Sequence, residues 1–377
     1  MQRRRTLSVA LIGTGFMGKA HSNGWRQAPR FFSLAADIRM ATICGRDRAM
    51  TRRAAQKFGW ATTTTDWRTT MTDPAIDVVD ICTPNDSHAE IAIAAARSGK
   101  AILCEKPLAR DRREAHLMVN AVQRARVVNM VCHNYRRVPA VALAKQMIDA
   151  GEIGDRIYHF RGRYAQDWIA DKKFPLVWRL QSPIAGSGVI GDLGAHVIDL
   201  ARHLVGEVDD ICATSETFVK RRPREKNRRG YGKVDVDDAV TVIGKFRRGA
   251  MLSLEATRFA RGRKNQLTFE IDGSGGSLLF DLEQMNRLQF LSASDPIGRQ
   301  GFRDILVTEP SHPYVGNWWP PGHVIGYEHS FVHTIADFVN AVIARKRVRP
   351  DFADGLETQR VLEAIVRSAR GRRWIAL

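Results

Sequence analysis

Short apolar runs alternate with longer amphipathic stretches along the first third of the chain. The runs are rich in β-branched residues, whereas apolar positions in the longer stretches recur at helical spacing. This alternation predicts an α/β fold in which a doubly wound parallel sheet forms a first domain over residues 1–134. The predicted strands are Leu7–Ile12, Met40–Cys44, Ile76–Cys82, Ala101–Cys104 and Val127–Cys132.

Two segments of this first domain carry a helix-capping pattern. Ser87–Glu90 and Asp111–Glu114 each place a capping side chain three residues before a glutamate. The cap accepts a hydrogen bond from the amide of the first turn, and the glutamate returns one. We therefore expect helices to begin at Ser87 and Asp111.

The pattern changes after Tyr135, where a short helix precedes many strands separated by glycine-rich turns. This texture predicts a second, α+β domain over residues 135–350 with an open, largely antiparallel sheet. The C-terminal segment 351–377 is expected to form a helix that returns to the first domain. The predicted elements are helices Ala140–Ala150, Glu328–Arg345 and Leu356–Arg370 and strands Ile157–Tyr164, Ala239–Phe246, Ala250–Thr257, Gln266–Asp272 and Ser277–Asp281.

Composition narrows the class of protein. The 377 residues are 44% hydrophobic and 26% charged, which excludes a disordered or low-complexity chain. The 58 Lys and Arg residues exceed the 40 Asp and Glu residues, so the net charge of +18 creates a positive field that attracts anions. No apolar run approaches the ~20 residues of a membrane span, so no membrane partner is expected.

The cysteines favour a reducing compartment. There are five, an odd number, and they form no C-x-x-C pair. Most of them close apolar runs, as small buried hydrophobic residues do. The basic start Met1–Arg5 is followed by too short an apolar run for a secretion signal. We expect a cytoplasmic protein.

A glycine motif at the first strand predicts dinucleotide binding. Gly13, Gly15 and Gly18 form G-x-G-x-x-G between a predicted strand and a predicted helix. The glycines allow a tight turn, a close approach to a pyrophosphate and close helix packing, and Phe16 and Met17 open the helix that faces the phosphates. The alternative is a structural glycine turn without a ligand.

The end of the second strand bears on the choice between NAD and NADP. An acidic residue usually binds the adenosine ribose there, but this chain has Gly45. Arg46 could pair with a 2′-phosphate, which favours NADP, or could be a solvated turn residue. Asp47 could still reach a ribose hydroxyl. On this reading, Gly45→Asp should sharpen a preference for NAD.

Two further segments follow the ends of parallel strands, where ligands bind in such sheets. They are Thr83-Pro84-Asn85 and Glu105-Lys106-Pro107, and His88 follows the first of them. A lysine at this position is poised over the nicotinamide.

Asp192 and His196 open an apolar helical stretch in the second domain. Four residues apart, they share one helix face. A neutral imidazole near pH 7 suits a base that removes a hydroxyl proton. The alternative is a helix pair with a purely structural role, and no metal site is predicted.

The order G-x-G-x-x-G, E-K-P and G-D-x-x-x-H over nearly the whole chain resembles the glucose–fructose oxidoreductase/inositol dehydrogenase/MocA-like (Gfo/Idh/MocA) family. Segments 134–139, 166–168, 177–179 and 186–196 resemble the levoglucosan dehydrogenase and glycoside 3-dehydrogenase subgroup. The resemblance implies a Rossmann domain, a second domain whose open sheet helps form a homo-oligomer (dimer or tetramer), and Lys106, Asp192 and His196 as catalytic residues. It also implies NAD as cofactor, with NADP possible.

The implied activity is oxidation of a secondary hydroxyl of a sugar, anhydrosugar or glycoside to a keto-sugar. Alternatives are an NADPH-dependent reductase of a dicarbonyl or anhydro sugar, a redox-assisted glycosidase, and a non-catalytic nucleotide-binding regulator. Aromatic faces stack on sugar rings while polar groups bind hydroxyls. The expected substrate contacts are Lys106, Tyr135, Arg136, Trp168, Arg179, Asp192 and His196.

A basic run at Lys220–Arg229 could bind nucleic acid. Aromatic residues do not interleave it, and it lies between predicted strands. We therefore expect a solvated loop, with a small carbohydrate and not a nucleic acid as the partner of this protein.

Overall fold

The computed structural model describes residues 4–225 and 229–377. The chain divides into two compact units. The first contains Met1–Arg137 and Gly326–Glu357, and the second contains Val138–Ile325 and Thr358–Leu377.

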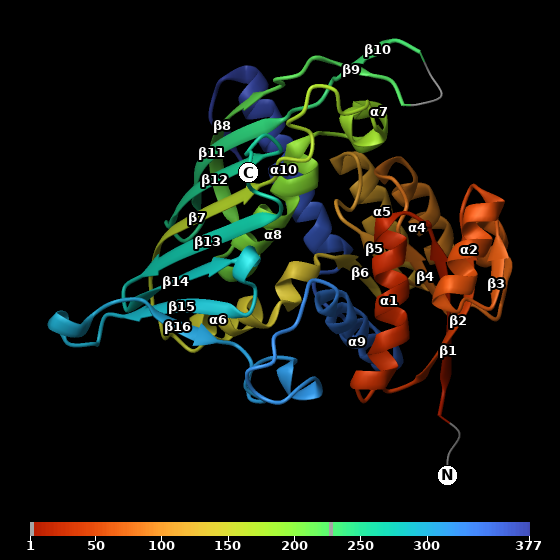
Figure 1. Ribbon diagram of the computed structural model, residues 1–377, viewed down its shortest axis with the longest axis horizontal. Helices are drawn as coiled ribbons and strands as arrows, with labels where there is room; N and C mark the ends of the chain where they lie inside the picture. Colours follow the sequence, from red (N-terminus) through yellow and green to blue (C-terminus); the bar gives the residue numbers. More distant parts are fainter. Residues whose placement is uncertain (1–3, 226–228) are drawn as a thin grey trace. The chain divides into compact units, whose positions relative to one another are not determined.

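The first unit is built on a parallel sheet with strand order β3-β2-β1-β4-β5-β6 (Figure 1). This order is that of a dinucleotide-binding Rossmann fold, so the predicted parallel sheet is confirmed. The short β3, a run of threonines, was not predicted. The strands are β1 (Thr6–Ile12), β2 (Asp37–Cys44), β3 (Thr62–Thr64), β4 (Val78–Ile81), β5 (Ala101–Glu105) and β6 (Asn129–Cys132).

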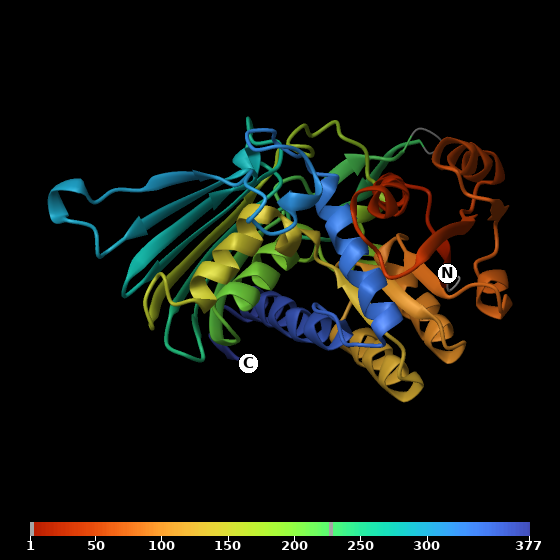
Figure 2. The same cartoon turned by 90° about the horizontal axis from the view of Figure 1, so that it is seen from below.

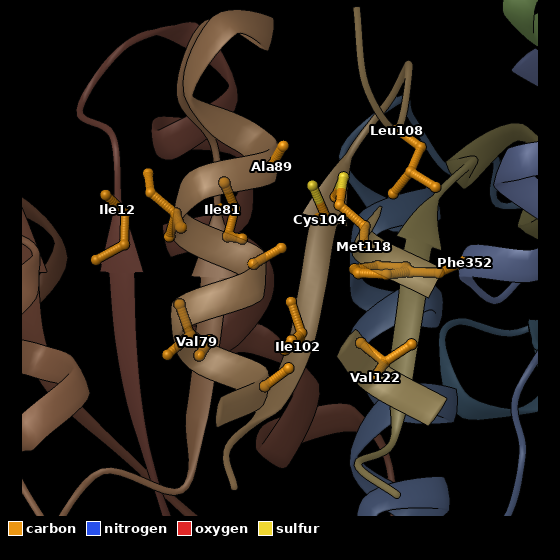
Figure 3. Packing of buried hydrophobic residues seen from close by; sticks show 14 of the residues in the cluster. Ile12, Val79, Ile81, Ala89, Ile102, Cys104, Leu108, Met118, Val122 and Phe352 are labelled. Carbon is orange, nitrogen blue, oxygen red and sulfur yellow. The ribbon is translucent and has the colours of Figure 1, made fainter. Parts of the chain in front are cut away.

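Helices bury the central strands of this sheet. Every residue of β4 and β5 is buried. Their side chains pack with those of the helices in one core, in which Phe352 inserts beside Leu108 and Met118 (Figure 3). The helices of this segment are α1 (Phe16–Phe31), α2 (Arg48–Phe58), α3 (Arg68–Thr72), α4 (His88–Arg97) and α5 (Arg112–Ala125).

The two predicted helix starts differ in their capping. Asp111 caps α5 as expected, because its carboxylate accepts a hydrogen bond from the Glu114 amide at 2.8 Å. The helix start at Ser87 is confirmed, because Ser87 is the N-cap of α4, but the expected side-chain cap is absent. Its hydroxyl instead donates to Thr83 Oγ1 at 2.7 Å within the preceding turn.

The second unit is built on a mixed sheet with strand order β16-β15-β14-β13-β7-β12-β11-β8-β17 (Figure 1). The antiparallel expectation is confirmed for most neighbours, but β7 and β12 pair in parallel. A separate hairpin joins β9 (Arg221–Pro223) and β10 (Tyr231–Lys233). The sheet strands are β7 (Ile157–Ala165), β8 (Val208–Glu216), β11 (Ala239–Phe246), β12 (Met251–Thr257), β13 (Gln266–Gly273), β14 (Gly276–Asp281), β15 (Arg287–Ser292), β16 (Arg303–Leu306) and β17 (Ile375–Ala376).

Helices line one face of this sheet. Helices α6 (Pro139–Asp149, yellow) and α8 (Ala195–Leu204, green) run along it, and Figure 2 shows both on the same side. Buried and exposed residues alternate strictly along β11, as expected when helices cover only one face. Gly162 of β7 permits a close approach, because a Cβ there would lie 2.4 Å from Val197 Cγ1 of α8.

The C-terminal helices do not follow the predicted domain ranges. Helix α9 (His329–Ala344) packs on α1 in the first unit, where Gly24 leaves room for Ile335. The predicted range 135–350 assigned this helix to the second domain. Helix α10 (Phe352–Gly371) begins in the first unit and continues in the second, where Ser368 Oγ accepts a hydrogen bond from the Ala213 amide at 2.9 Å.

One helical segment, Ser182–Leu204, is long and apolar enough to cross a membrane by length and composition. No such segment was predicted from the sequence. About four fifths of it (78%) is buried inside the protein, so its apolar side chains serve packing. It includes α7 (Ser182–Ala185), a π-helical turn (Ile190–Gly194) and α8.

We expect Gly162→Ala to destabilise the second unit by about 1–3 kcal/mol, because the added methyl group overpacks α8 against the sheet. Val197→Ala should remove the shorter of the two close contacts and leave the one with Phe160 Cε1 at 2.8 Å, so the double variant should be more stable than the sum of the single effects predicts. Urea denaturation of the three variants measures this coupling. Additive effects would show that the close approach of α8 is not limiting.

Candidate active site

The three glycines of the first loop have different structural reasons. Gly13 has φ of +117°, and a Cβ there would lie 2.5 Å from the Cys82 carbonyl oxygen. A Cβ on Gly18 would lie 2.0 Å from the Gly13 carbonyl oxygen. A Cβ on Gly15, in contrast, would meet nothing within 4 Å. The protein itself therefore requires Gly13 and Gly18, whereas Gly15 keeps space open at the start of α1.

The start of α1 fits a pyrophosphate. Gly15 is its N-cap and provides no side chain to occupy the first amide groups of the helix. Such amides and the helix dipole stabilise an anion. Phe16 and Met17 of the first turn were predicted to contact the cofactor, and Phe16 is 64% exposed.

At the end of β2, Gly45 lies close to two threonine side chains. A Cβ there would lie 2.4 Å from Thr51 Oγ1 and 2.7 Å from Thr14 Cγ2, so the glycine makes room for Thr14 in the glycine loop. An aspartate at position 45 would require Thr51 and Thr14 to move, and the expected gain in NAD preference stays a prediction. Asp47 caps α2 by accepting from the Met50 amide at 2.8 Å, and Arg46 is exposed.

The loops after β4 and β5 are tied together by His88. Its imidazole is fully buried, with Nδ1 3.1 Å from the Pro107 carbonyl oxygen and Nε2 3.0 Å from that of Thr83. We predicted a cofactor contact for His88, but the ring is enclosed and joins Thr83 to the Glu105–Pro107 turn. Asn85 lies buried between these residues in the sequence, and Lys106 is half-buried.

A buried network of charges lies directly behind Lys106. His21 of α1 places Nδ1 2.9 Å from Asp80 Oδ2 and Nε2 2.9 Å from Glu105 Oε1. Trp25 donates to Asp80 at 2.7 Å, and the second Glu105 oxygen accepts from the Lys106 amide at 3.1 Å. Through Glu105, the network thus holds the backbone amide of Lys106 in place.

The charges of this network depend on one another. Burial is the largest single effect on His21 and disfavours its imidazolium, but its buried neighbours, Asp80 first among them, together outweigh burial and raise the pKa of His21 well above its usual value. Burial would likewise raise the pKa of Glu105, but the hydrogen bond from His21 and the charges of His21 and Lys106 lower it. His21 is therefore a buried cation between two carboxylates.

Sequence reasoning missed His21 and Asp80. Asp80 interrupts an otherwise apolar buried strand, and this was the one available signal. Ligand atoms of His21, Asp80 and Cys82, and of His21, Glu105 and Cys132, also lie close enough to hold a metal ion. The ion pairs account for this arrangement, because both imidazole nitrogens already face a carboxylate.

Four cysteines of the first unit are buried thiols. Cys44, Cys82, Cys104 and Cys132 are buried, as predicted. Burial raises the pKa of Cys132 to about 12 and that of Cys44 to about 11. Thiolates are the reactive form, so these residues act as small apolar side chains.

In the second unit, Asp192 lies in a π-helical turn and not in the regular helix predicted for it. Such turns are rare and often occur at functional sites. Asp237 holds the start of this segment, because its carboxylate accepts from the Gly188 amide at 2.9 Å and the Ile190 amide at 2.7 Å. A Cβ at Gly188 would lie 2.0 Å from the Asp237 carbonyl oxygen, so the two segments touch closely.

Asp192 is bound to a residue that sequence reasoning did not single out. Arg258, just after β12, donates to Asp192 Oδ2 at 2.9 Å and is almost fully buried. His196 is also buried, and its ring packs edge-on against Tyr164 at 5.8 Å between centroids. The structure therefore supplies an oriented carboxylate and an enclosed imidazole on consecutive turns.

The other two expected sugar contacts of this unit, Trp168 and Arg179, lie in segment 166–180. Trp168 packs against Phe174, and the Arg179 guanidinium stacks on Trp178 at 4.3 Å. This segment has a small apolar core of its own, which contains Ile169, Leu176, Leu180, Val234 and Val236.

The basic run 220–229 is only partly a solvated loop. Lys226, Asn227 and Arg228 lie outside the described residues, and Lys220 is exposed. Arg222, however, is fully buried and donates to the carbonyl oxygens of Ile169 at 2.6 Å and Asp171 at 2.8 Å. The expectation is therefore wrong for Arg222, which clamps the segment that carries Trp168.

Two expected sugar contacts of the first unit have protein partners. Tyr135 is buried and packs edge-on against Tyr327 at 6.4 Å. Arg136 is buried. Burial raises the pKa of the nearby Asp354 carboxyl, and the charge of Arg136 offsets part of this rise. Tyr135 and Arg136 therefore contribute to the packing and the charge balance of the first unit, in addition to any role in binding a ligand.

Comparisons with known proteins identify relatives over the whole chain. Residues 7–133 match the family described as oxidoreductase family, NAD-binding Rossmann fold, and residues 141–279 match the GFO/IDH/MocA C-terminal domain. A protein named levoglucosan dehydrogenase from Pseudarthrobacter phenanthrenivorans is 46% identical over 98% of both chains. An inositol 2-dehydrogenase from Rhizobium meliloti is 25% identical over 99% of both.

Solved structures of oxidoreductases also resemble this chain over nearly its whole length. A levoglucosan dehydrogenase in complex with NADH and levoglucosan is 47% identical over 99% of both chains, with a TM-score of 0.95. An oxidoreductase domain protein from Kribbella flavida is 50% identical over 99% of both, with a TM-score of 0.96.

The network around His21 predicts a pH-dependent stability. Its raised pKa contributes to the free energy of unfolding fully below the usual histidine value of 6.5, and the contribution is lost as the pH rises through the folded-state pKa. In urea titrations the wild type should therefore lose stability above pH 6.5 more steeply than His21→Gln. The variant itself should be about 3–5 kcal/mol less stable at pH 6.5, because it leaves two carboxylates without their cation.

His116→Gln, on the exposed face of α5, is the matched control and should follow the wild type. Parallel pH curves for the wild type and His21→Gln would contradict a charged His21.

The glycine loop allows protein stability and cofactor binding to be separated. Gly15→Ala should leave thermal stability within about 1 kcal/mol, because its Cβ meets open space, yet weaken NAD binding at least about tenfold by blocking the pyrophosphate. Gly18→Ala should destabilise the first unit, because its Cβ overlaps the Gly13 carbonyl oxygen. Calorimetric titration with NAD and thermal unfolding measure the two effects. Unchanged NAD affinity in Gly15→Ala would place the pyrophosphate elsewhere.

Proposed function

Because this chain belongs to the GFO/IDH/MocA oxidoreductase family with an NAD-binding Rossmann fold, we propose that it oxidises a secondary hydroxyl of an anhydrosugar of the levoglucosan type, or of a related sugar or glycoside, to a ketone. One observation carries the choice of substrate: the 46% identity to levoglucosan dehydrogenase extends over 98% of both chains. The +18 net charge does not oppose it, because a neutral sugar needs no field to bind.

The residues of the chain divide the chemistry between them. NAD, when bound, accepts a hydride from the carbon that carries the hydroxyl. His196 takes the hydroxyl proton, since a buried imidazole can act as a base near neutral pH. The Lys106 ammonium stabilises the negative charge that develops on the oxygen, and Asp192 orients the sugar. The half-buried Lys106 stands on a backbone that Glu105 fixes.

NAD is held by the glycine loop and the loops after β4 and β5 in this proposal. The residues are Gly13, Gly15, Phe16, Met17, Gly18, Gly45, Thr83, Pro84, Asn85, Glu105 and Lys106, with His88 tying the two later loops together. Exposed Arg46 supports acceptance of NADP as well, since a guanidinium pairs with a 2′-phosphate. The same feature favours the second candidate function, reduction of a keto or anhydro sugar with NADPH.

Three further features belong to the proposal. Trp168 and Arg179 form the sugar-binding wall of the second unit, and Tyr135 and Arg136 contribute from the first. The open face of the second sheet, which exposes Ile243 and Met251, forms a homo-oligomer (dimer or tetramer). A cytoplasmic location stays a prediction from the cysteine content.

The test is a panel of levoglucosan, glucosides, inositols and free sugars, followed at the nicotinamide absorbance with NAD and with NADP. We expect turnover of levoglucosan with NAD, and a loss of at least about 10²-fold in kcat for His196→Ala and for Lys106→Ala, with NAD binding retained. His116→Ala, an exposed histidine, should match the wild type. An inactive wild type would favour the regulator, and a fully active His196→Ala would remove His196 from the proton transfer.

A further inference from the structure

A single buried guanidinium, that of Arg258, connects the segments of the second unit that carry the proposed substrate residues. Its Nη2 donates to Asp192 Oδ2 at 2.9 Å and to the Gly188 carbonyl oxygen at 3.0 Å. Its Nη1 approaches the Arg179 carbonyl oxygen at 3.5 Å, and its plane centre lies 5.3 Å from the Trp168 ring. The π-helical turn and the 166–180 segment therefore share one anchor.

Arg258 has little freedom to move. Its side chain is 1% exposed, and its amide donates to the Asp238 carbonyl oxygen at 3.1 Å. Asp238 is itself fully buried, and burial raises the pKa of its carboxyl although the charges of Arg222 and Arg258 lower it. The packing around Arg258 thus fixes where its donors point.

A buried cation is costly unless it is paired and hydrogen-bonded. Asp192 supplies the charge partner of Arg258, and its side chain is 20% exposed while that of Arg258 is 1% exposed. One carboxylate oxygen is held by the guanidinium from the protein side. The carboxylate therefore reaches the surface of this unit in an orientation that Arg258 sets.

We propose that Arg258 is a positioning residue for the sugar, which orients the Asp192 carboxylate and aligns the Trp168 and Arg179 wall with it. This inference rests on the proposed function of Asp192. One guanidinium would then couple the binding of sugar hydroxyls by Asp192 to the stacking of the sugar ring on Trp168. A lysine cannot replace it, because its ammonium lacks the fixed, planar set of N–H donors. An intact substrate site then requires arginine at this position.

Arg222 provides a matched comparison within the same unit. It is also a fully buried arginine, and it holds the same 166–180 segment. Its guanidinium donates to the carbonyl oxygens of Ile169, Asp171 and Phe174. A loss of Arg222 therefore loosens the Trp168 wall without removing the cation bound to Asp192.

The experiment compares Arg258→Met, Arg258→Lys and Arg222→Met in the full-length enzyme with levoglucosan and NAD. Arg258→Met should lower kcat by about tenfold or more and raise the KM for sugar, because both the carboxylate and the wall lose their anchor. Arg258→Lys restores the charge alone, so we expect it to recover part of kcat while the KM stays raised. Arg222→Met should raise the KM with kcat within about threefold of the wild type.

NAD affinity, measured by calorimetry, should stay within about twofold in all three variants, since the glycine loop is untouched. Equal kcat and KM effects in Arg258→Met and Arg222→Met would overturn the proposal, because they would reduce Arg258 to a packing residue. Full recovery of both constants by Arg258→Lys would also overturn it. A loss of the near-ultraviolet circular dichroism of Arg258→Met would mean that this variant does not fold. The kcat and KM of Arg258→Lys and Arg258→Gln are then compared with those of Arg222→Met instead.

Asp192→Asn separates this proposal from the proposed function. We expect it to lose activity more severely than Arg258→Lys. An unimpaired Asp192→Asn would mean that the assigned role of Asp192 is wrong. An impaired Asp192→Asn together with a wild-type Arg258→Met would instead refute the role of Arg258 alone.

Discussion

A charge inside a packed protein core must be paired or hydrogen-bonded, and each unit of this protein contains a buried cation that a carboxylate pairs beside the proposed site. In the first unit the cation is His21, held between Asp80 and Glu105. In the second it is Arg258, held by Asp192. The first pair adjoins Lys106 through its backbone amide, and the second includes Asp192 itself, so each holds a residue that we assign to the reaction.

The consequence differs between the two units. The His21 network is enclosed, and its contact with Lys106 passes through the backbone amide that donates to Glu105. It therefore stabilises the turn that carries Lys106. The Arg258 pair extends to a partly exposed carboxylate, so it acts on a side chain that a ligand can reach. Rigid support behind such groups reduces the reorganisation that a reaction requires.

Close backbone packing supplies the second constraint. Gly18 lies against the Gly13 carbonyl, Gly162 against α8, and Gly188 against Asp237. At each position a methyl group would displace an element that carries a proposed site residue. Gly15 is the contrasting position, because its missing side chain leaves space that the protein does not fill.

The sequence by itself determined the local elements and the motifs that depend on them. The spacing of apolar residues identified the parallel sheet, the capping pattern identified the helix start at Asp111, and the glycine motif identified the first loop. Each of these signals depends on neighbours within a few residues. The tertiary structure decided what depends on contacts between distant segments. Helix α9 looked like part of the second domain until its packing on α1 was known. Arg222 was expected in a solvated loop, and Arg258 was not singled out from the sequence. Only the fold shows that they are buried, because desolvation and pairing arise when segments far apart in the sequence close around a side chain.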